Sequence, residues 1–195
     1  MEGGRHHIKY LDRAQTARFF SVIQDRRDRA LFGTIYHYGL RVSEATLIRL
    51  DDVDLPRGRI WIHRVKSGVG GERPLLSNTA ALISAFLPVR LPTGPELFTG
   101  RQGGLKPSRI QQLFRHYAET AGLQGFSVHC LRHAIATHLL EAGQGIEYVR
   151  DHLGHVNIQN TMVYAEITSP WREKVFAELE KKPEIVKVNS QGERK

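Results

Sequence analysis

The sequence predicts one domain that is mainly α-helical and carries a small antiparallel β-sheet. Apolar residues recur every three or four positions along most of the chain, which is the spacing of a buried helix face. One stretch is rich in β-branched and aromatic residues, as strands are. The 195 residues, 41% hydrophobic and 25% charged, suit one domain that folds in water. We expect an N-terminal extension at 1–7, the domain at 8–180 and a polar, mobile tail at 181–195.

Residues that start and stop helices mark the helical segments. Asp12 and Gln15 have the spacing of a capping box, and the apolar stripe after them predicts a first helix. A second helix is expected at 28–36, with Gly39 at the position of a left-handed C-terminal cap. Further helices are predicted at 43–49, 78–87, 107–121, 131–142, 146–153, 158–167 and 170–180.

The β-sheet is expected to be a hairpin. Residues 59–66 are rich in isoleucine, valine and tryptophan, and residues 72–76 can pair with them across a glycine-rich turn at 67–71. A cluster of acidic residues precedes this strand and is interpreted as a solvated turn without chemistry. The cluster consists of Asp51, Asp52 and Asp54.

The charge of the chain predicts a polyanionic partner. A formal net charge of +8 favours nucleic acid, because the release of counterions from phosphates drives binding. No stretch long enough to cross a bilayer is free of charge, and the N-terminus has no apolar run like that of a signal peptide. We therefore expect no membrane contact and a cytoplasmic location. The one cysteine, Cys130, is expected to be a small buried thiol.

Several cationic or hydrogen-bonding residues are placed where they could hold one anion. His129 and Arg132 are three residues apart, so they share one face of a helix. Arg41 lies at the junction of two predicted helices, where the backbone donors of the second helix also favour an anion. Lys66 leads into the glycine-rich turn and can reach over a substrate.

A histidine and a tyrosine follow near the end of the chain. His155 comes directly after Gly154, which is expected to end a helix, and Tyr164 is nine residues further on. Tyr164 lies on the helix predicted at 158–167 and is expected to lie off its buried face. That face is predicted to consist of Ile158, Met162 and Ala165.

In order and spacing these residues resemble the tyrosine recombinase family, also called phage integrases. The family pattern is an arginine in G-L-R-x-S-E, a hairpin lysine, H-x-L-R, L-G-H and a tyrosine, and all six positions are filled over roughly residues 8–179. The resemblance implies the catalytic-domain fold of that family, with Glu44 supporting a phosphate pocket and Tyr164 acting as nucleophile. The implied pocket residues are Arg41, Lys66, His129, Arg132 and His155.

The residue types suit phosphoryl transfer without a metal or a cofactor. Arginine stays protonated and binds two oxygens at once, which stabilises charge on a phosphate. The phenol of Tyr164 has an ordinary pKa of about 10 and needs a proton acceptor, which the sequence does not name. Lys66 is the expected general acid for the departing 5′ oxygen. A phosphotyrosyl ester allows resealing without ATP, and the resemblance implies attachment to a 3′ phosphate.

The expected function is site-specific recombination of double-stranded DNA. One alternative is relaxation of DNA by a type IB topoisomerase, and another is a DNA-binding regulator without turnover. A zinc hydrolase is a third alternative, but the glutamate of zincins is absent, and Arg132 and Tyr164 would have no role in it. The histidines that would serve as ligands are His129, His133, His152 and His155.

Further contacts to DNA and to a second copy of the chain are expected at the surface. Four basic residues of the hairpin and of the loop near Gly103 could contact phosphates: Arg64, Arg73, Lys106 and Arg109. Near the C-terminus an apolar stripe either packs on its own domain or docks on a neighbouring copy, as the resemblance suggests for copies assembled on DNA. The stripe consists of Trp171, Val175 and Leu179.

Overall fold

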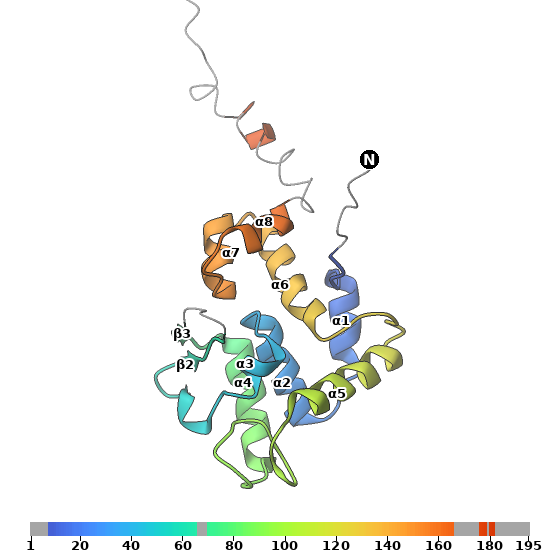
Figure 1. Ribbon diagram of the computed structural model, residues 1–195, viewed down its shortest axis with the longest axis vertical. Coiled ribbons are helices and arrows are strands. Elements are labelled where there is room, and N and C mark those ends of the chain that lie inside the picture. Colours follow the sequence, from blue (N-terminus) through green and yellow to red (C-terminus); the bar gives the residue numbers. More distant parts are fainter. Residues whose placement is uncertain (1–7, 66–69, 166–175, 179, 182–195) are drawn as a thin grey trace, which may run out of the picture.

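The computed structural model describes residues 8–65, 70–165, 176–178 and 180–181. Within these residues helices predominate and two small antiparallel sheets complete the fold (Figure 1), which confirms the predicted fold class. The helices are α1 (Arg13–Ser21), α2 (Arg26–His37), α3 (Val42–Ala45), α4 (Ser77–Phe86), α5 (Pro107–Thr120), α6 (His129–Glu141), α7 (Ile146–Leu153) and α8 (Gln159–Ala165). The strands are β1 (Val53–Asp54), β2 (Arg59–Ile62), β3 (Gly71–Pro74), β4 (Thr99–Gly100) and β5 (Gly103–Gly104). None of the helices in the described ranges has the length and apolar character needed to cross a membrane.

Local signals explain where α1 and α2 begin and end. Asp12 accepts a 2.7 Å hydrogen bond from the Gln15 amide, and the Gln15 side chain accepts one of 3.0 Å from the Asp12 amide, so the predicted capping box is present. α2 begins earlier than predicted because Asp25 caps it, accepting a 2.9 Å hydrogen bond from the Asp28 amide. Gly39 follows α2 with a φ of 56°, the left-handed conformation that was predicted.

α3 is shorter than the predicted helix at 43–49. The backbone beyond it pairs with a distant segment instead of continuing the helix. The Leu97 amide donates to the carbonyl of Ile48 at 2.8 Å, and the Leu50 amide donates to the carbonyl of Pro95 at 2.9 Å. These long-range bonds fix an extended backbone where local spacing alone favoured a helix.

The predicted hairpin is confirmed and is part of a three-stranded sheet. β2 and β3 are antiparallel, with Ile60 opposite Arg73 and Trp61 opposite Glu72. β1 pairs with the other edge of β2 and was not predicted. Ile60 is fully buried whereas Trp61 is 46% exposed, because neighbouring side chains of a strand point to opposite faces. One face of the sheet therefore covers the core.

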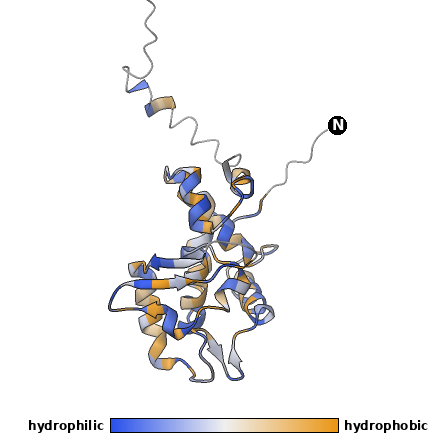
Figure 2. Cartoon of the chain, turned by 60° about the vertical axis from the view of Figure 1, so that its left-hand side comes forward, coloured by the Kyte–Doolittle hydropathy of each residue, from blue (hydrophilic) through white to orange (hydrophobic). Residues whose placement is uncertain are grey.

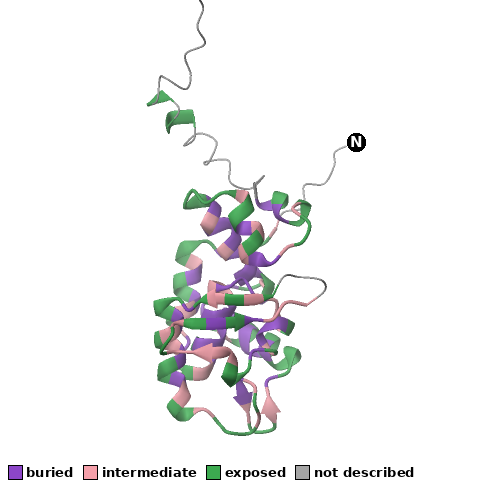
Figure 3. Cartoon of the chain, turned by 90° about the vertical axis from the view of Figure 1, so that its left-hand side faces the viewer, coloured by how far each residue is buried: buried purple, intermediate pink, exposed green. Residues whose placement is uncertain are grey.

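The core consists of a large and a small cluster. The large cluster joins α1, α2, α4, α5 and the first part of α6, and it includes Phe19, Phe32 and Phe114. The small cluster lies where α7 and α8 pack on the second part of α6, and it includes Leu140 and Tyr164. Buried residues fill the interior (Figure 3), and the longer helices carry apolar and polar residues on different sides (Figure 2). The candidate nucleophile therefore belongs to the smaller cluster.

The buried face of α8 differs from the prediction. Ile158, Met162 and Ala165 were expected to face inward, but Met162 is 41% exposed whereas Tyr164 is only 2% exposed. Thr161, three residues before Tyr164, is fully buried and shares its face. The prediction was wrong because α8 has only seven residues, too few for a stripe to be read from apolar positions alone.

Candidate active site

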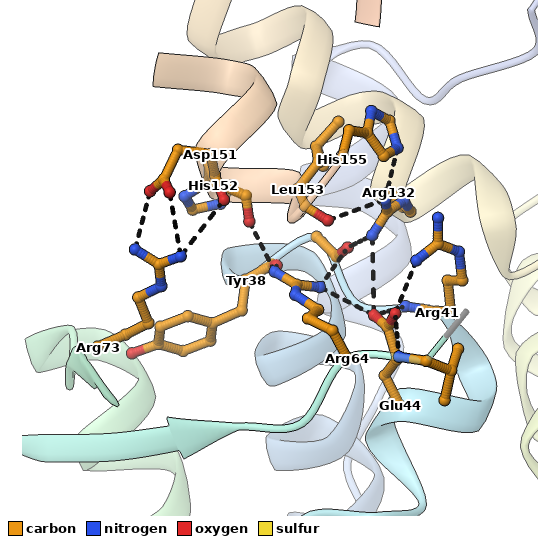
Figure 4. A network of polar contacts seen from close by, with 12 residues as sticks. Tyr38, Arg41, Glu44, Arg64, Arg73, Arg132, Asp151, His152, Leu153 and His155 are labelled. Atoms are coloured by element: carbon orange, nitrogen blue, oxygen red, sulfur yellow. Dashed lines mark hydrogen bonds and ion pairs between the residues drawn. The ribbon is translucent and has the colours of Figure 1, made fainter. Parts of the chain in front are cut away.

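Glu44 is the centre of the site. Its side chain is fully buried and accepts hydrogen bonds from the guanidinium groups of Arg41 at 2.7 Å and Arg64 at 2.8 Å. A third guanidinium, that of Arg132, lies 3.8 Å from the same carboxylate (Figure 4). Burial by itself raises the pKa of Glu44, but the backbone amide of Arg41 and the charge of Arg64 together lower it below its usual value. Three arginine side chains from separate parts of the chain therefore lie within 4 Å of one buried carboxylate.

Arg41 is positioned by the turn between α2 and α3. Its backbone amide donates a 2.9 Å hydrogen bond to the side chain of Glu44 at the start of α3. Its side chain is 28% exposed, whereas that of Glu44 has no exposure. The ion pair therefore holds one part of the guanidinium in place while other donors reach solvent, where an anion could bind.

Arg132 is anchored inside the protein. It is 2% exposed and donates hydrogen bonds to the carbonyl of Gly39, to the carbonyl of Leu153 at 3.0 Å and to His155 Nε2 at 2.7 Å. These contacts connect α6 to the ends of α2 and α7 (Figure 4). Burial, followed by the charge of Arg41, lowers the pKa of Arg132 to about 10, so the group stays protonated at neutral pH. Arg132 therefore contributes a fixed positive charge.

His155 has a defined tautomer. An arginine can only donate, so the 2.7 Å contact with Arg132 makes Nε2 of His155 the acceptor. In the neutral ring the proton is then on Nδ1, which donates to the hydroxyl of Thr161 at 2.9 Å. Burial, followed by the charge of Arg132, lowers the pKa of His155 to about 4. His155 is thus neutral at pH 7, and a bound phosphate would favour its protonated form.

His129 begins α6 at the edge of the site. Its side chain reaches solvent, whereas Arg132, one turn later, is buried. Desolvation by surrounding atoms, followed by the charges of Arg132 and Arg41, lowers the pKa of His129. These charges lie near enough to His129 to affect its ring, and His129 and Arg132 both belong to α6.

Tyr164 lies against α6, where its hydroxyl is 2.7 Å from Nδ1 of His133. Burial raises the pKa of Tyr164, and the charges of Arg132 and Arg41 partly oppose that effect. The hydroxyl of the predicted nucleophile thus contacts His133, and within the described residues no hydrogen bond joins it to Arg41 or Arg132. His133 was considered only as a zinc ligand in the sequence, although its position four residues after His129 was a signal that it faces the same site.

Two predicted features lie outside the described residues. One is Lys66, the expected general acid. The other is the apolar stripe of the C-terminal segment, Trp171, Val175 and Leu179.

The other basic residues expected at the DNA surface differ in their environment. Arg64 was predicted to contact DNA, and this prediction was wrong. Its side chain is 2% exposed and makes internal hydrogen bonds, so it cannot contact a phosphate in this conformation. Arg73 pairs with Asp151 at 2.8 Å and so connects β3 to α7. Lys106 and Arg109 are exposed and line a pocket beside the β4–β5 turn, together with Arg27 and Arg101, for which no sequence motif indicated a role.

Two of the four histidines considered as zinc ligands, His133 and His155, have other partners. Within the described ranges no three His, Cys, Asp or Glu side chains are grouped so that they could hold a metal ion. Nδ1 of His133 contacts Tyr164, and both ring nitrogens of His155 are engaged by Arg132 and Thr161. Cys130 is buried, as predicted, and burial raises the pKa of its thiol to about 12.

Comparison with known proteins points to one family. The sequence matches the phage integrase family over residues 9–169. Tyrosine recombinase XerA of Thermococcus kodakarensis is 35% identical over 166 residues, which are 82% of this chain and 58% of that protein. Tyrosine recombinase XerC of Stutzerimonas stutzeri is 35% identical over 155 residues, which are 77% of this chain and 52% of that protein. The chain thus spans little more than half the length of these relatives.

Solved structures share the fold. The crystal structure of XerA recombinase has a TM-score of 0.78 at 23% identity, covering 91% of this chain and 66% of that one. XerH site-specific recombinase, in a post-cleavage complex with a palindromic difH substrate, has a TM-score of 0.73 at 21% identity, covering 88% of this chain and 53% of that one. The arrangement of helices and small sheets is therefore the one these recombinases use.

Proposed function

Because the chain belongs to the phage integrase family of tyrosine recombinases, we propose that it breaks and rejoins DNA at specific sites through a 3′-phosphotyrosyl intermediate on Tyr164. The observation that carries the proposal is the group formed by Arg41, Arg132 and His155 beside buried Glu44. The positive charges of Arg132 and Arg41 also act on Tyr164, where they lower the pKa of the phenol against the effect of burial. Such a group suits a phosphodiester, since fixed cations stabilise the charge that gathers on the nonbridging oxygens in the transition state.

The phosphate would bind at the solvent side of this group. Arg41 and His129 reach solvent and would contact the phosphate directly. Arg132 is buried and would contribute its positive charge from inside the protein. Glu44 acts through the arginines, because its carboxylate fixes the direction of the Arg41 guanidinium. Once the anion is present, the pKa of His155 would rise, and its protonated Nε2 could donate to a phosphate oxygen after the contact with Arg132 is exchanged for one with the phosphate.

In the proposed reaction the phenolic oxygen of Tyr164 forms a bond to phosphorus and the bond from phosphorus to the 5′ oxygen breaks. The phenol gives up its proton to solvent water, and the departing 5′ oxygen receives one, for which we propose Lys66 as donor. The 5′ hydroxyl of a second strand then attacks the phosphotyrosyl ester, which restores the phenol and a phosphodiester. Since no bond energy is lost to water, this cycle needs neither ATP nor a cofactor.

The proposed partners are double-stranded DNA and further copies of the chain. The net charge of +8 supports binding to a polyanion, and exposed Lys106 and Arg109 are proposed as additional phosphate contacts. Recombination joins two DNA sites, so we propose that copies associate on DNA through the C-terminal segment. The proposed location is the cytoplasm, where the protein would bind its DNA.

A nicked suicide substrate tests the proposal. It should trap a protein and DNA adduct that survives denaturation, that is absent in Tyr164→Phe and that forms in EDTA. Tyr148→Phe is the matched control, because Tyr148 lies on the neighbouring helix α7 and is 51% exposed, so the adduct should persist. Strand transfer between paired sites would support recombination. Relaxation of supercoiled DNA without such sites would indicate a topoisomerase, and binding without an adduct would indicate a regulator.

A further inference from the structure

His133 contacts the reacting atom of the proposed nucleophile, although it has no part in the proposed reaction above. Its Nδ1 is 2.7 Å from the hydroxyl of Tyr164, and the two ring centres are 5.6 Å apart. A phenol is a good donor and a neutral imidazole nitrogen a good acceptor, so we assign the hydrogen bond as donated by Tyr164 to His133. The phenolic proton thus has a partner before any DNA binds.

Both members of this pair are held in their neutral forms. Burial, followed by the charges of His129 and Arg132, lowers the pKa of His133 to about 4. Burial raises the pKa of Tyr164, an effect that the charges of Arg132 and Arg41 only partly oppose. The proton therefore stays on the tyrosine, and the contact is a neutral hydrogen bond rather than an ion pair.

The same helix makes a second contact of this kind. Among residues 159–164 of α8, Thr161 and Tyr164 are buried, whereas Met162 and Val163 are each 41% exposed. The Thr161 hydroxyl contacts Nδ1 of His155 at 2.9 Å, as that of Tyr164 contacts His133. Both buried side chains thus join α8 by hydrogen bonds to histidines of the neighbouring elements, in addition to the apolar packing of Tyr164.

We infer that His133 is a positioning residue that holds the Tyr164 hydroxyl inside the protein until DNA occupies the phosphate site. Tyr164 is 2% exposed, so its oxygen cannot meet a phosphate of duplex DNA in this conformation. α8 must shift before attack, and the hydrogen bond to His133 is broken when it does. This inference rests on the proposed role of Tyr164, but the conformational part can be measured without DNA.

Hydrogen exchange of the full chain without DNA tests the holding contact. His133→Phe keeps a ring of similar size but removes the acceptor, so amides of α8 should exchange about twofold to tenfold faster, the range expected for one neutral hydrogen bond. His133→Asn keeps an acceptor near the position of Nδ1 and should restore the exchange rates. If His133→Phe does not fold, His133→Leu serves the same purpose.

A matched histidine on the same helix provides the control. His138 of α6 contacts the hydroxyl of Tyr36 through Nδ1 at 2.9 Å, the same type of bond away from α8. His138→Phe should leave the exchange of α8 unchanged. Unchanged exchange of α8 in His133→Phe, or equal acceleration in His138→Phe, would overturn the inference.

The rate of adduct formation on the suicide substrate gives a second measurement. His133→Phe should form the adduct about twofold to tenfold faster than the unmodified chain, because less free energy is needed to release Tyr164. His133→Asn should match the unmodified chain. Slower adduct formation in His133→Phe would overturn the inference, since His133 would then assist the attack, for instance by taking the proton. If the unmodified chain forms no adduct, the proposed function fails, and the exchange rates alone decide whether His133 holds α8.

Discussion

Arg64 donates a 2.8 Å hydrogen bond to Glu44, and neither side chain is more than 2% exposed. The same guanidinium donates to the carbonyl of Tyr38 at 3.0 Å and to that of His152 at 2.6 Å. One side chain therefore joins the segment after β2 to the end of α2 and to α7 (Figure 4). Arg64 supports the site from inside, in place of the DNA contact that its position in the sequence had suggested.

Arg64→Met should strongly destabilise the protein. It leaves a buried carboxylate with one partner fewer, and breaking a buried ion pair typically costs about 3–5 kcal/mol. Urea titration should show this loss in the free energy of unfolding. Arg73→Met is the control, since Arg73 and Asp151 are 30% and 59% exposed and such pairs contribute less than about 1 kcal/mol. Equal losses in the two variants would contradict the structural role of Arg64.

Arg41→Lys should impair the reaction without unfolding the protein. Lysine can keep an ion pair with Glu44, but it lacks the additional N–H donors with which a guanidinium can bind a phosphate oxygen at the same time. We expect adduct formation to slow by about 100-fold or more, as for loss of one transition-state donor. Single-turnover cleavage of the suicide substrate measures this. Arg57→Lys, in the β1–β2 turn where the side chain is 70% exposed, should change the rate little, and an unaffected Arg41→Lys would remove Arg41 from the phosphate site.

Gly154→Ala should disturb the site through the position of Arg64. Gly154 has a φ of 66°, and a Cβ there would lie 2.8 Å from Nε of Arg64. Gly143 also has a positive φ, 86°, but an added Cβ would meet no atom within 4 Å. Both alanine variants carry backbone strain of about 1 kcal/mol, so the difference between them measures the clash. Thermal or urea unfolding should show the larger loss for Gly154→Ala, and equal losses would contradict the close packing.

Stability should fall as the pH is lowered from 7 to 5. Burial is the first cause that lowers the pKa of His133, His152 and His155 from 6.5 to about 4 each. Between these pH values the unfolded chain binds protons that the folded chain does not, so acid favours unfolding. The free energy of unfolding should decrease by about 1 kcal/mol or more over this range. His152→Asn removes one of the three groups, so its decrease should be smaller; an unchanged pH dependence would show that His152 is not held neutral.

The sequence was most informative where the chemistry depends on local spacing. His129 and Arg132 lie one turn apart on α6, and Gly39 turns the chain so that Arg41 lies directly before α3. These relations follow from helix periodicity and from the conformational freedom of glycine, which act over a few residues. The order of the motifs could therefore be compared with a family pattern before any contact was known. The position of Glu44, three residues after Arg41, belongs to the same local geometry.

The sequence was least informative where a side chain is placed by distant contacts. Arg64 is buried because the end of the hairpin meets α7, a contact between residues 88 positions apart. Tyr164 is buried because α8 packs on α6, and exposed Met162 shows that hydrophobicity alone does not fix the orientation of so short a helix. The hydrogen bond between His133 and Tyr164 depends on that orientation, so no local pattern could have revealed it.

The most direct test of strand breakage by this chain is to locate the DNA within the trapped adduct. After nuclease and protease digestion, mass spectrometry of the wild-type adduct should find a nucleotide joined through its 3′ phosphate to the peptide that contains Tyr164. A nucleotide on any other residue, or a 5′ linkage, would contradict the proposed chemistry.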